Sequence, residues 1–206
     1  MKQLSLNLPD KTSVVLASGS PRRRELLKQI GLDFTVMVSQ ADETIPEAMD
    51  PKLAVQTLSL LKAADVAQKA EKDALIIAAD TIVVYENEIL TKPKDEQDAV
   101  RMLSRLSGKT HSVLTGVTVL RRKDGKSISL TEETFVTFKD LQEQEILSYV
   151  KTGEPGDKAG AYGVQGLGGL FIEKIEGDYY NVVGLPLCLL GKLLQTEFDF
   201  ELTWEV

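Results

Sequence analysis

One segment near the N-terminus constrains the fold most, because it joins an apolar strand to a helix through a turn of small residues. Ser13–Ala17 has the composition of a buried strand, and Ser18–Ser20 has that of a tight turn. Pro21 suits the first position of a helix, which Gly31 then ends. The same alternation of strand and helix signals continues along the chain and predicts an α/β fold.

The predicted elements lie on both sides of several turn signals. We expect strands over Ser13–Ala17, Asp33–Val38, Ala74–Val84, His111–Leu120, Ser127–Phe138 and Leu170–Ile175, and helices over Pro21–Ile30, Pro51–Ala70, Glu96–Leu106, Leu141–Lys151 and Leu185–Thr196. Arg121–Gly125 is predicted as a hairpin turn, and the mixed polar and apolar pattern after it is typical of a half-exposed antiparallel strand. Asp140 and Glu143 have the spacing of a capping box. The predicted sheet is therefore mixed and flanked by helices.

No repeat, low-complexity tract or flexible linker divides the 206 residues, so we expect a single domain over residues 13–206 after an N-terminal extension of residues 1–12. The net charge of −7 argues against a protein that binds nucleic acid by neutralising phosphates. The N-terminus lacks the apolar core of a signal peptide, and no apolar run approaches about 18 residues. These features predict a cytoplasmic protein that does not enter membranes.

The single cysteine and the single histidine are both interpreted as structural residues. Cys188 cannot form an intrachain disulfide, and its apolar helical surroundings predict a packed core thiol. His111 begins a strand and has no second histidine beside it in the sequence, which argues against zinc binding and Ser-His-Asp catalysis.

The turn from Ser18 to Arg24 carries two serines and three arginines, which is typical of an anion site. A helix N-terminus offers free N–H groups and a positive dipole end, and guanidinium groups match the geometry of phosphate oxygens. In the alternative interpretation the serines only cap the helix and the arginines are solvated.

Asp80 interrupts an otherwise continuous apolar strand and is followed by the hydroxyl of Thr81. Burial of a carboxylate costs roughly several kcal/mol unless the group is paired, hydrogen-bonded or bound to metal. This cost favours a functional role for Asp80. The alternative places Asp80 at a strand end, where it bonds a turn. Glu43, in the acidic pair that follows the second strand, is a candidate second metal ligand.

Two lysines are candidate phosphate-binding cations. Lys92 follows a short strand directly before a proline, and Lys62 lies within an apolar helix. Solvent exposure is the ordinary alternative for each.

The segment from Glu154 to Gly169 is rich in glycine, which permits close backbone approach to a ligand. It follows neither the Walker pattern nor the dinucleotide-binding fingerprint. Gln165 offers an amide that complements one donor and acceptor pair of uracil or thymine. In the alternative, the glycines only make turns and Gln165 is solvated.

Several of these motifs occur in the order found in a known family. The segments Leu16–Arg23, Ala79–Thr81, Lys92–Pro93, Met102–Gly108, His111–Val113 and Gly153–Gly166 resemble the Maf-like nucleoside triphosphate pyrophosphatases. The resemblance extends from about Ser13 to about Leu190. It implies an elongated α/β fold with two lobes and a cleft, similar to that of inosine triphosphate pyrophosphatases. It also implies hydrolysis of a nucleoside triphosphate to the monophosphate and pyrophosphate with a divalent cation, Mg²⁺ or Mn²⁺, and a possible homodimer.

Asp157–Gly166 looks like the branch of that family that acts on dTTP and UTP. The resemblance implies that Asp80 is the catalytic proton acceptor and that Arg22, Thr81 and Gln165 are specificity positions. The other polar site residues that it implies are Ser18, Glu43, Lys62 and Lys92. Thr91 and Gly156 depart from the residues common in relatives, which bears on fine specificity. Asp80 and Glu43 would hold the metal, whereas Arg22, Lys62 and Lys92 would stabilise charge on phosphate oxygens.

Two other functions are compatible with this sequence. One is a nucleotide-sensing regulator, for example of cell division, that needs no turnover. The other is a pyrophosphatase for a purine or 7-methylguanosine triphosphate. A panel of triphosphates would separate all three.

Overall fold

A computed structural model describes residues 4–7, 12–44, 46 and 49–204 of the chain. The strands are β1 (Leu4–Asn7), β2 (Ser13–Leu16), β3 (Thr35–Val36), β4 (Ala74–Tyr85), β5 (Glu88–Leu90), β6 (Thr110–Arg121), β7 (Ser127–Phe138), β8 (Ile172–Glu176) and β9 (Glu201–Trp204). The α-helices are α1 (Pro21–Gln29), α2 (Pro51–Lys69), α3 (Glu96–Leu106), α4 (Glu143–Val150), α5 (Tyr179–Val183) and α6 (Leu187–Glu197). Three short 3-10 helices are η1 (Glu154–Asp157), η2 (Ala159–Ala161) and η3 (Leu167–Phe171). The predicted α/β class is confirmed.

The main sheet is mixed, as predicted, and has the strand order β3-β2-β4-β6-β7-β8, with β5 paired to β4. Strands β2, β3 and β4 pair in parallel, whereas β5 and β8 pair antiparallel to β4 and β7. A second sheet pairs β1 with β9. The described chain forms two compact units. Unit 1 comprises the described residues within 1–80, 115–131 and 184–206, and unit 2 comprises residues 81–114 and 132–183.

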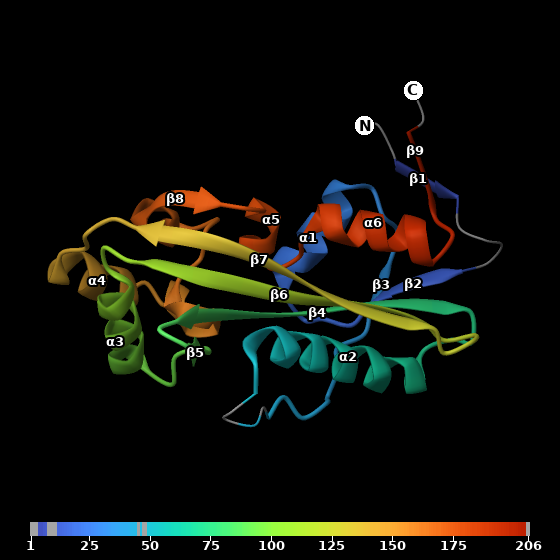
Figure 1. The fold of residues 1–206 in the computed structure, drawn as a ribbon, viewed down its shortest axis with the longest axis horizontal. Coiled ribbons are helices and arrows are strands. Elements are labelled where there is room, and N and C mark those ends of the chain that lie inside the picture. The colour runs from blue at the N-terminus through green and yellow to red at the C-terminus, as the bar shows by residue number, and fades with distance from the viewer. Residues whose placement is uncertain (1–3, 8–11, 45, 47–48, 205–206) are drawn as a thin grey trace. The chain divides into compact units, whose positions relative to one another are not determined.

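In unit 1, helix α2 covers one face of the sheet, and α1 and α6 lie on the other face (Figure 1). Gly116 of β6 lets α2 approach closely, because a Cβ atom at this position would lie 2.2 Å from the carbonyl oxygen of Val55. Caps fix the start of α2, where Asp50 accepts hydrogen bonds from the N–H groups of Lys52 and Leu53. The helix thus begins at a defined residue and presents a fixed face to the sheet.

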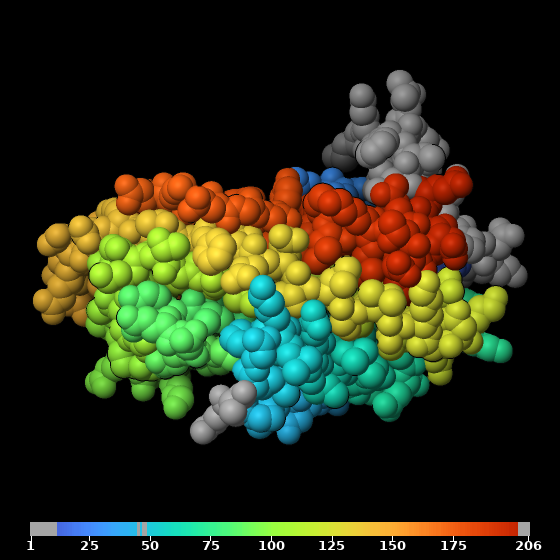
Figure 2. Space-filling model, in the orientation of Figure 1, coloured from blue at the N-terminus to red at the C-terminus, as the bar shows by residue number. Residues whose placement is uncertain are grey.

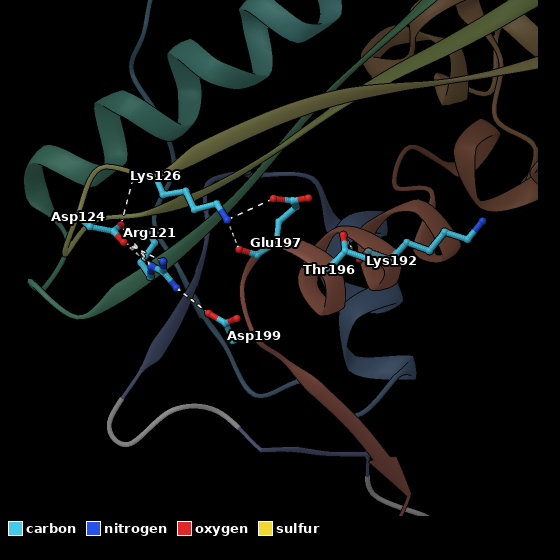
Figure 3. Close-up of polar contacts among 7 residues, drawn as sticks. All are labelled: Arg121, Asp124, Lys126, Lys192, Thr196, Glu197 and Asp199. Carbon is cyan, nitrogen blue, oxygen red and sulfur yellow. Dashed lines mark hydrogen bonds and ion pairs between the residues drawn. The ribbon is translucent and has the colours of Figure 1, made fainter.

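Polar contacts join the predicted hairpin turn to the end of α6, also within unit 1 (Figure 3). Arg121 pairs with Asp124 and Asp199, and Lys126 pairs with Glu197. The Arg121 hydrogen bonds lower the pKa of Asp124 to about 2. In the space-filling view, the surface of α6 adjoins that of this hairpin (Figure 2). Each exposed ion pair of this kind contributes little to the free energy of unfolding. We therefore interpret these pairs as fixing the position of the hairpin turn beside α6.

In unit 2, α3 packs against α4 and η2 over a core that includes Phe138, Tyr162 and Phe171. His111 lies in this core with 2% exposure, and its Nε2 shares a 2.8 Å hydrogen bond with the hydroxyl of Tyr162. Burial lowers the pKa of His111 to about 4, so the ring is neutral at pH 7. The interpretation of His111 as a structural residue agrees with this position.

The structure corrects several predicted details. Cys188 is exposed, so its assignment to the core is wrong. Helix α6 buries Leu190, Leu193 and Leu194, and a residue two positions before Leu190 points away from that face. The capping box lies two residues later than predicted, since the N–H of Gln142, rather than of Asp140, donates to the carboxylate of Glu145.

Two predicted strands are shorter than expected. Within Asp33–Val38 only Thr35 and Val36 pair, at the exposed edge of the sheet. Within Leu170–Ile175 the first two residues belong to η3, where neighbouring glycines favour a tight turn, and β8 begins at Ile172. Among the described residues, none of the helices is both long and apolar enough to cross a membrane.

Candidate active site

The turn between β2 and α1 encloses a serine and an arginine of unit 1. Ser18 is buried, and its Oγ accepts hydrogen bonds from the N–H of Ser20 and from Nη1 of Arg23. The Nε of Arg23 also donates to the carbonyl oxygen of Gly184 over 2.8 Å. The turn is therefore held by Arg23, a residue for which no individual role was predicted from the sequence. Arg22 lies beside it, half-buried.

Burial lowers the pKa of the Arg23 guanidinium, and the charges of Asp80 and Glu43 oppose that effect. Those opposing charges place a cationic group of this turn in the electrostatic field of both carboxylates. Arg23 of the predicted anion-binding turn therefore interacts electrostatically with acidic groups of the protein itself.

Asp80, Lys62 and Glu43 form the central polar group of unit 1. The Lys62 Nζ lies 2.5 Å from Oδ1 of Asp80 and 3.0 Å from Oε2 of Glu43. The side chains of Lys62 and Asp80 are 11% and 12% exposed, whereas that of Glu43 is 55% exposed. Asp80 is therefore buried within β4 and paired with Lys62 of α2, so the alternative that placed it at a strand end is wrong.

The loop that carries Glu43 is fastened to α2 by a second carboxylate. Asp65 accepts hydrogen bonds from Oγ of Ser39 and from the N–H of Gln40. Asp42, next to Glu43, bonds the N–H and hydroxyl of Thr44, and these bonds lower the pKa of Asp42. Asp42 therefore serves the local turn, whereas Glu43 points to Lys62.

The remaining predicted site residues lie in unit 2. Thr81 follows Asp80 directly on β4 and is half-buried. Lys92 lies just after β5, as predicted, and is exposed. Gln165 is exposed in the turn between η2 and η3. The turn that carries Lys92 is tied to the glycine-rich segment, because the carbonyl oxygen of Thr91 accepts from the N–H of Gly160.

The glycines of this segment allow close approach to the protein's own atoms. A Cβ at Gly160 would lie 2.8 Å from Val83, and one at Gly169 would lie 2.8 Å from the carbonyl oxygen of Val164. Lys158 pairs with its neighbour Asp157 at 2.6 Å. Packing within unit 2 thus accounts for these glycines without a ligand.

The comparisons with known proteins agree with the motifs. A sequence model of the family described as Maf-like protein matches residues 13–197. The chain belongs to the Maf-like protein family.

The relatives of this Maf-like chain include proteins named dTTP/UTP pyrophosphatase. One from Thermoanaerobacter sp. strain X514 is 52% identical over 189 residues, which cover 92% of this chain and 98% of the relative. One from Bacillus cereus strain G9842 is 47% identical over 190 residues, which cover 92% and 97% of the two chains. Among solved structures, the Staphylococcus aureus Ham1 protein matches 63% of this chain and 73% of its own, with 17% identity and a TM-score of 0.44.

The donor set of this Maf-like chain fits a divalent cation that is also bound by a substrate. Among the residues described, no cluster of three or more His, Cys, Asp or Glu side chains could hold a metal alone. The two hard oxygen donors, Asp80 and Glu43, nevertheless converge on one positive charge, the Lys62 ammonium. Mg²⁺ commonly takes one or two carboxylates and completes its shell with phosphate oxygens and water.

Proposed function

We propose that this chain hydrolyses dTTP and UTP to the nucleoside monophosphate and pyrophosphate. The observation that carries the proposal is the buried Asp80 carboxylate, which is held by Lys62 in a chain 52% and 47% identical to two relatives named dTTP/UTP pyrophosphatase. Asp80 forms its short ion pair with the end of a lysine side chain, and a buried carboxylate with such an adaptable partner is suited to accept a proton during turnover.

In the proposed reaction, a water oxygen forms a bond to the α-phosphorus while the bond from that phosphorus to the bridging oxygen breaks. Asp80 takes the proton of the attacking water, and pyrophosphate leaves with the bonding electron pair. Lys62, Arg22 and Lys92 stabilise the charge on phosphate oxygens. A bound Mg²⁺ or Mn²⁺, held by Asp80 and Glu43, would polarise the phosphate and make the water more acidic.

In this proposal, the base is recognised chiefly by residues other than those that act on the phosphates. Gln165 pairs with the edge of uracil or thymine through its amide, and Thr81 and Arg22 contribute to specificity. Ser18 completes the polar site at the β2–α1 turn. The cytoplasmic location and the homodimer predicted from the sequence stay predictions.

The test is pyrophosphate release from a panel of triphosphates with Mg²⁺ or Mn²⁺. We expect dTTP and UTP to be the best substrates, and Asp80→Asn to lower turnover by about 10²-fold or more while nucleotide binding is retained. Asp42→Asn is the matched control, because Asp42 is exposed and bonds only its own turn in the contacts described.

Binding of nucleotide by the wild-type protein without pyrophosphate release would instead support a sensing regulator. Preference for a purine or 7-methylguanosine triphosphate would show that the substrate is not the proposed dTTP or UTP. Near-normal release of pyrophosphate by Asp80→Asn would contradict the role of Asp80 as proton acceptor.

A further inference from the structure

Glu154, the first residue of η1, has a carboxylate that is surrounded by hydrogen-bond donors of unit 2. Its Oε1 accepts from the hydroxyl of Tyr149 at 2.9 Å and from the N–H of Gly168 at 3.1 Å. Its Oε2 accepts from the N–H of Leu167 at 2.9 Å. Burial raises the pKa of Glu154, but the hydrogen bonds from Leu167, Gly168 and Tyr149 outweigh burial and lower it. The group is therefore ionised at neutral pH, and these are charge-assisted bonds.

The backbone approaches this carboxylate more closely than most side chains would permit. A Cβ atom at Gly166 would lie 2.4 Å from Oε1 and 2.5 Å from Oε2 of Glu154. At Gly168, a Cβ would lie 2.7 Å from the hydroxyl of Tyr149. The glycines at these positions are thus explained by the carboxylate and phenol around which the chain turns.

Tyr149 holds the other end of the same turn. Its hydroxyl accepts a hydrogen bond from the N–H of Gly163 at 3.3 Å while it donates to Glu154. Its ring is buried and packs edge-on against Phe171. The turn from Gly163 to Gly168 is therefore fastened at both ends by one connected pair of side chains.

Gln165 lies in the middle of this fastened turn, with its side chain exposed. An amide can distinguish bases only if its oxygen and nitrogen are held in one direction, because a freely rotating amide pairs with either pattern of donor and acceptor. Gln165 lies between Val164 and Gly166 in the sequence, so the direction in which its side chain leaves the chain depends on the backbone of the turn.

We propose that Glu154 is a positioning residue for base recognition, and that its carboxylate, with the Tyr149 hydroxyl, orients the turn that presents Gln165 to a pyrimidine base. This inference rests on the proposed function, since it assigns Gln165 to the base. Glu154 itself touches neither the base nor the phosphates in this proposal.

The test compares Glu154→Gln, Gln165→Ala and the double variant by dTTP affinity and by KM and kcat for dTTP and dCTP. Glutamine keeps the size of Glu154 but removes its charge. It also places an NH₂ group, which cannot accept a hydrogen bond, beside the Tyr149 hydroxyl and the N–H groups that donate to the carboxylate. We expect Glu154→Gln to raise the Kd and KM for dTTP by about tenfold, the equivalent of ~1.4 kcal/mol, with kcat changed less than about twofold. In the Gln165→Ala background the same substitution is expected to have no further effect on dTTP affinity.

Glu143→Gln is the matched control, because Glu143 is an exposed glutamate in the first turn of α4. Amide hydrogen exchange gives a readout independent of turnover, since the N–H groups of Leu167 and Gly168 should exchange faster in Glu154→Gln than in the control. If Glu154→Gln does not fold, Tyr149→Phe tests the same turn and should raise the Kd for dTTP in the same direction, again only when Gln165 is present.

The outcomes separate this inference from the function on which it rests. If Glu154→Gln lowers dTTP affinity equally in the presence of Gln165 and in the Gln165→Ala background, the positioning role is overturned. The proposed hydrolysis would not be affected by that result. An unchanged dTTP preference in Gln165→Ala would overturn the positioning role as well. Wild-type protein that binds dTTP but releases no pyrophosphate would refute the proposed hydrolysis, while the comparison of dTTP affinities would still decide the role of Glu154.

Discussion

Replacement of Lys62 by methionine removes the ammonium that lies between Asp80 and Glu43. Methionine fills nearly the same volume within α2, so the loss of charge dominates the effect. Asp80 is left with 12% of its side chain exposed and without its cation at 2.5 Å. A buried carboxylate in this state is costly, because water cannot replace the lost partner.

The two ion pairs of Lys62 contribute unequally. Removal of one partner from a buried pair costs about 3–5 kcal/mol, whereas an exposed pair is worth about 0–1 kcal/mol. The pair with Asp80 belongs to the first class, and Glu43, at 55% exposure, belongs to the second. Arg23 also acts on Asp80 electrostatically, which softens the loss. We therefore expect Lys62→Met to lower the free energy of unfolding by about 2–3 kcal/mol, or Tm by roughly 4–12 °C.

Thermal and urea unfolding measure this effect directly. Lys69→Met is the control on the same helix, because the pair between Lys69 and Asp65 is largely exposed on the lysine side, and we expect a change below about 1 kcal/mol. Addition of Asp80→Asn to Lys62→Met should recover part of the loss, since the unpaired charge is then absent. Mg²⁺ should raise the Tm of Lys62→Met more than that of the wild type, because both carboxylates are then free to bind it. Equal stability of Lys62→Met and Lys69→Met would refute the view that Lys62 neutralises Asp80.

Two further predictions concern the cores of the units. Because the folded pKa of His111, about 4, is below its ordinary value of 6.5, the unfolded chain binds the proton first as pH falls. Urea denaturation should show that acidification from about pH 7.5 to about pH 5.5 costs the wild type about 1 kcal/mol more than it costs His111→Gln, and equal pH slopes would contradict a neutral, buried ring. Gly116→Ala should destabilise the protein by about 1–3 kcal/mol, since the added methyl group meets the α2 backbone at Val55. Gly156→Ala, with open space around the added atom, should change the unfolding free energy little, and similar losses in both variants would argue against the close packing of α2.

The sequence predicts elements best where local signals and tertiary packing agree. Helix α3 begins and ends as predicted, because Asp95 caps it and its apolar residues share one face. Strand β7 also has its predicted bounds. Cys188 shows the opposite case, since an apolar neighbourhood in sequence does not specify which face of α6 is buried.

The candidate site shows the same division between what local patterns reveal and what they do not. The cost of a carboxylate inside an apolar strand identifies Asp80 from sequence alone, but its partner lies on a different element, and only the fold brings Lys62 to it. Arg23 and Glu154 were missed as individual residues for a related reason. The signal for Glu154 was present in the glycines that follow it, although their spacing does not say which side chain they surround.

The partners of Asp80 and Glu154 distinguish the roles of these two carboxylates. Glu154 is bonded by two backbone N–H groups and a buried phenol, all of which are fixed by the fold, so a change in its protonation would disturb the turn. Asp80 is paired with the end of a flexible lysine chain that also contacts Glu43 and can follow a change of charge. A group that accepts and returns a proton needs partners that can adapt, whereas a group that orders a loop needs rigid donors. By that criterion Asp80 is suited to chemistry and Glu154 to positioning, and exchange of their roles would require a different set of donors around each.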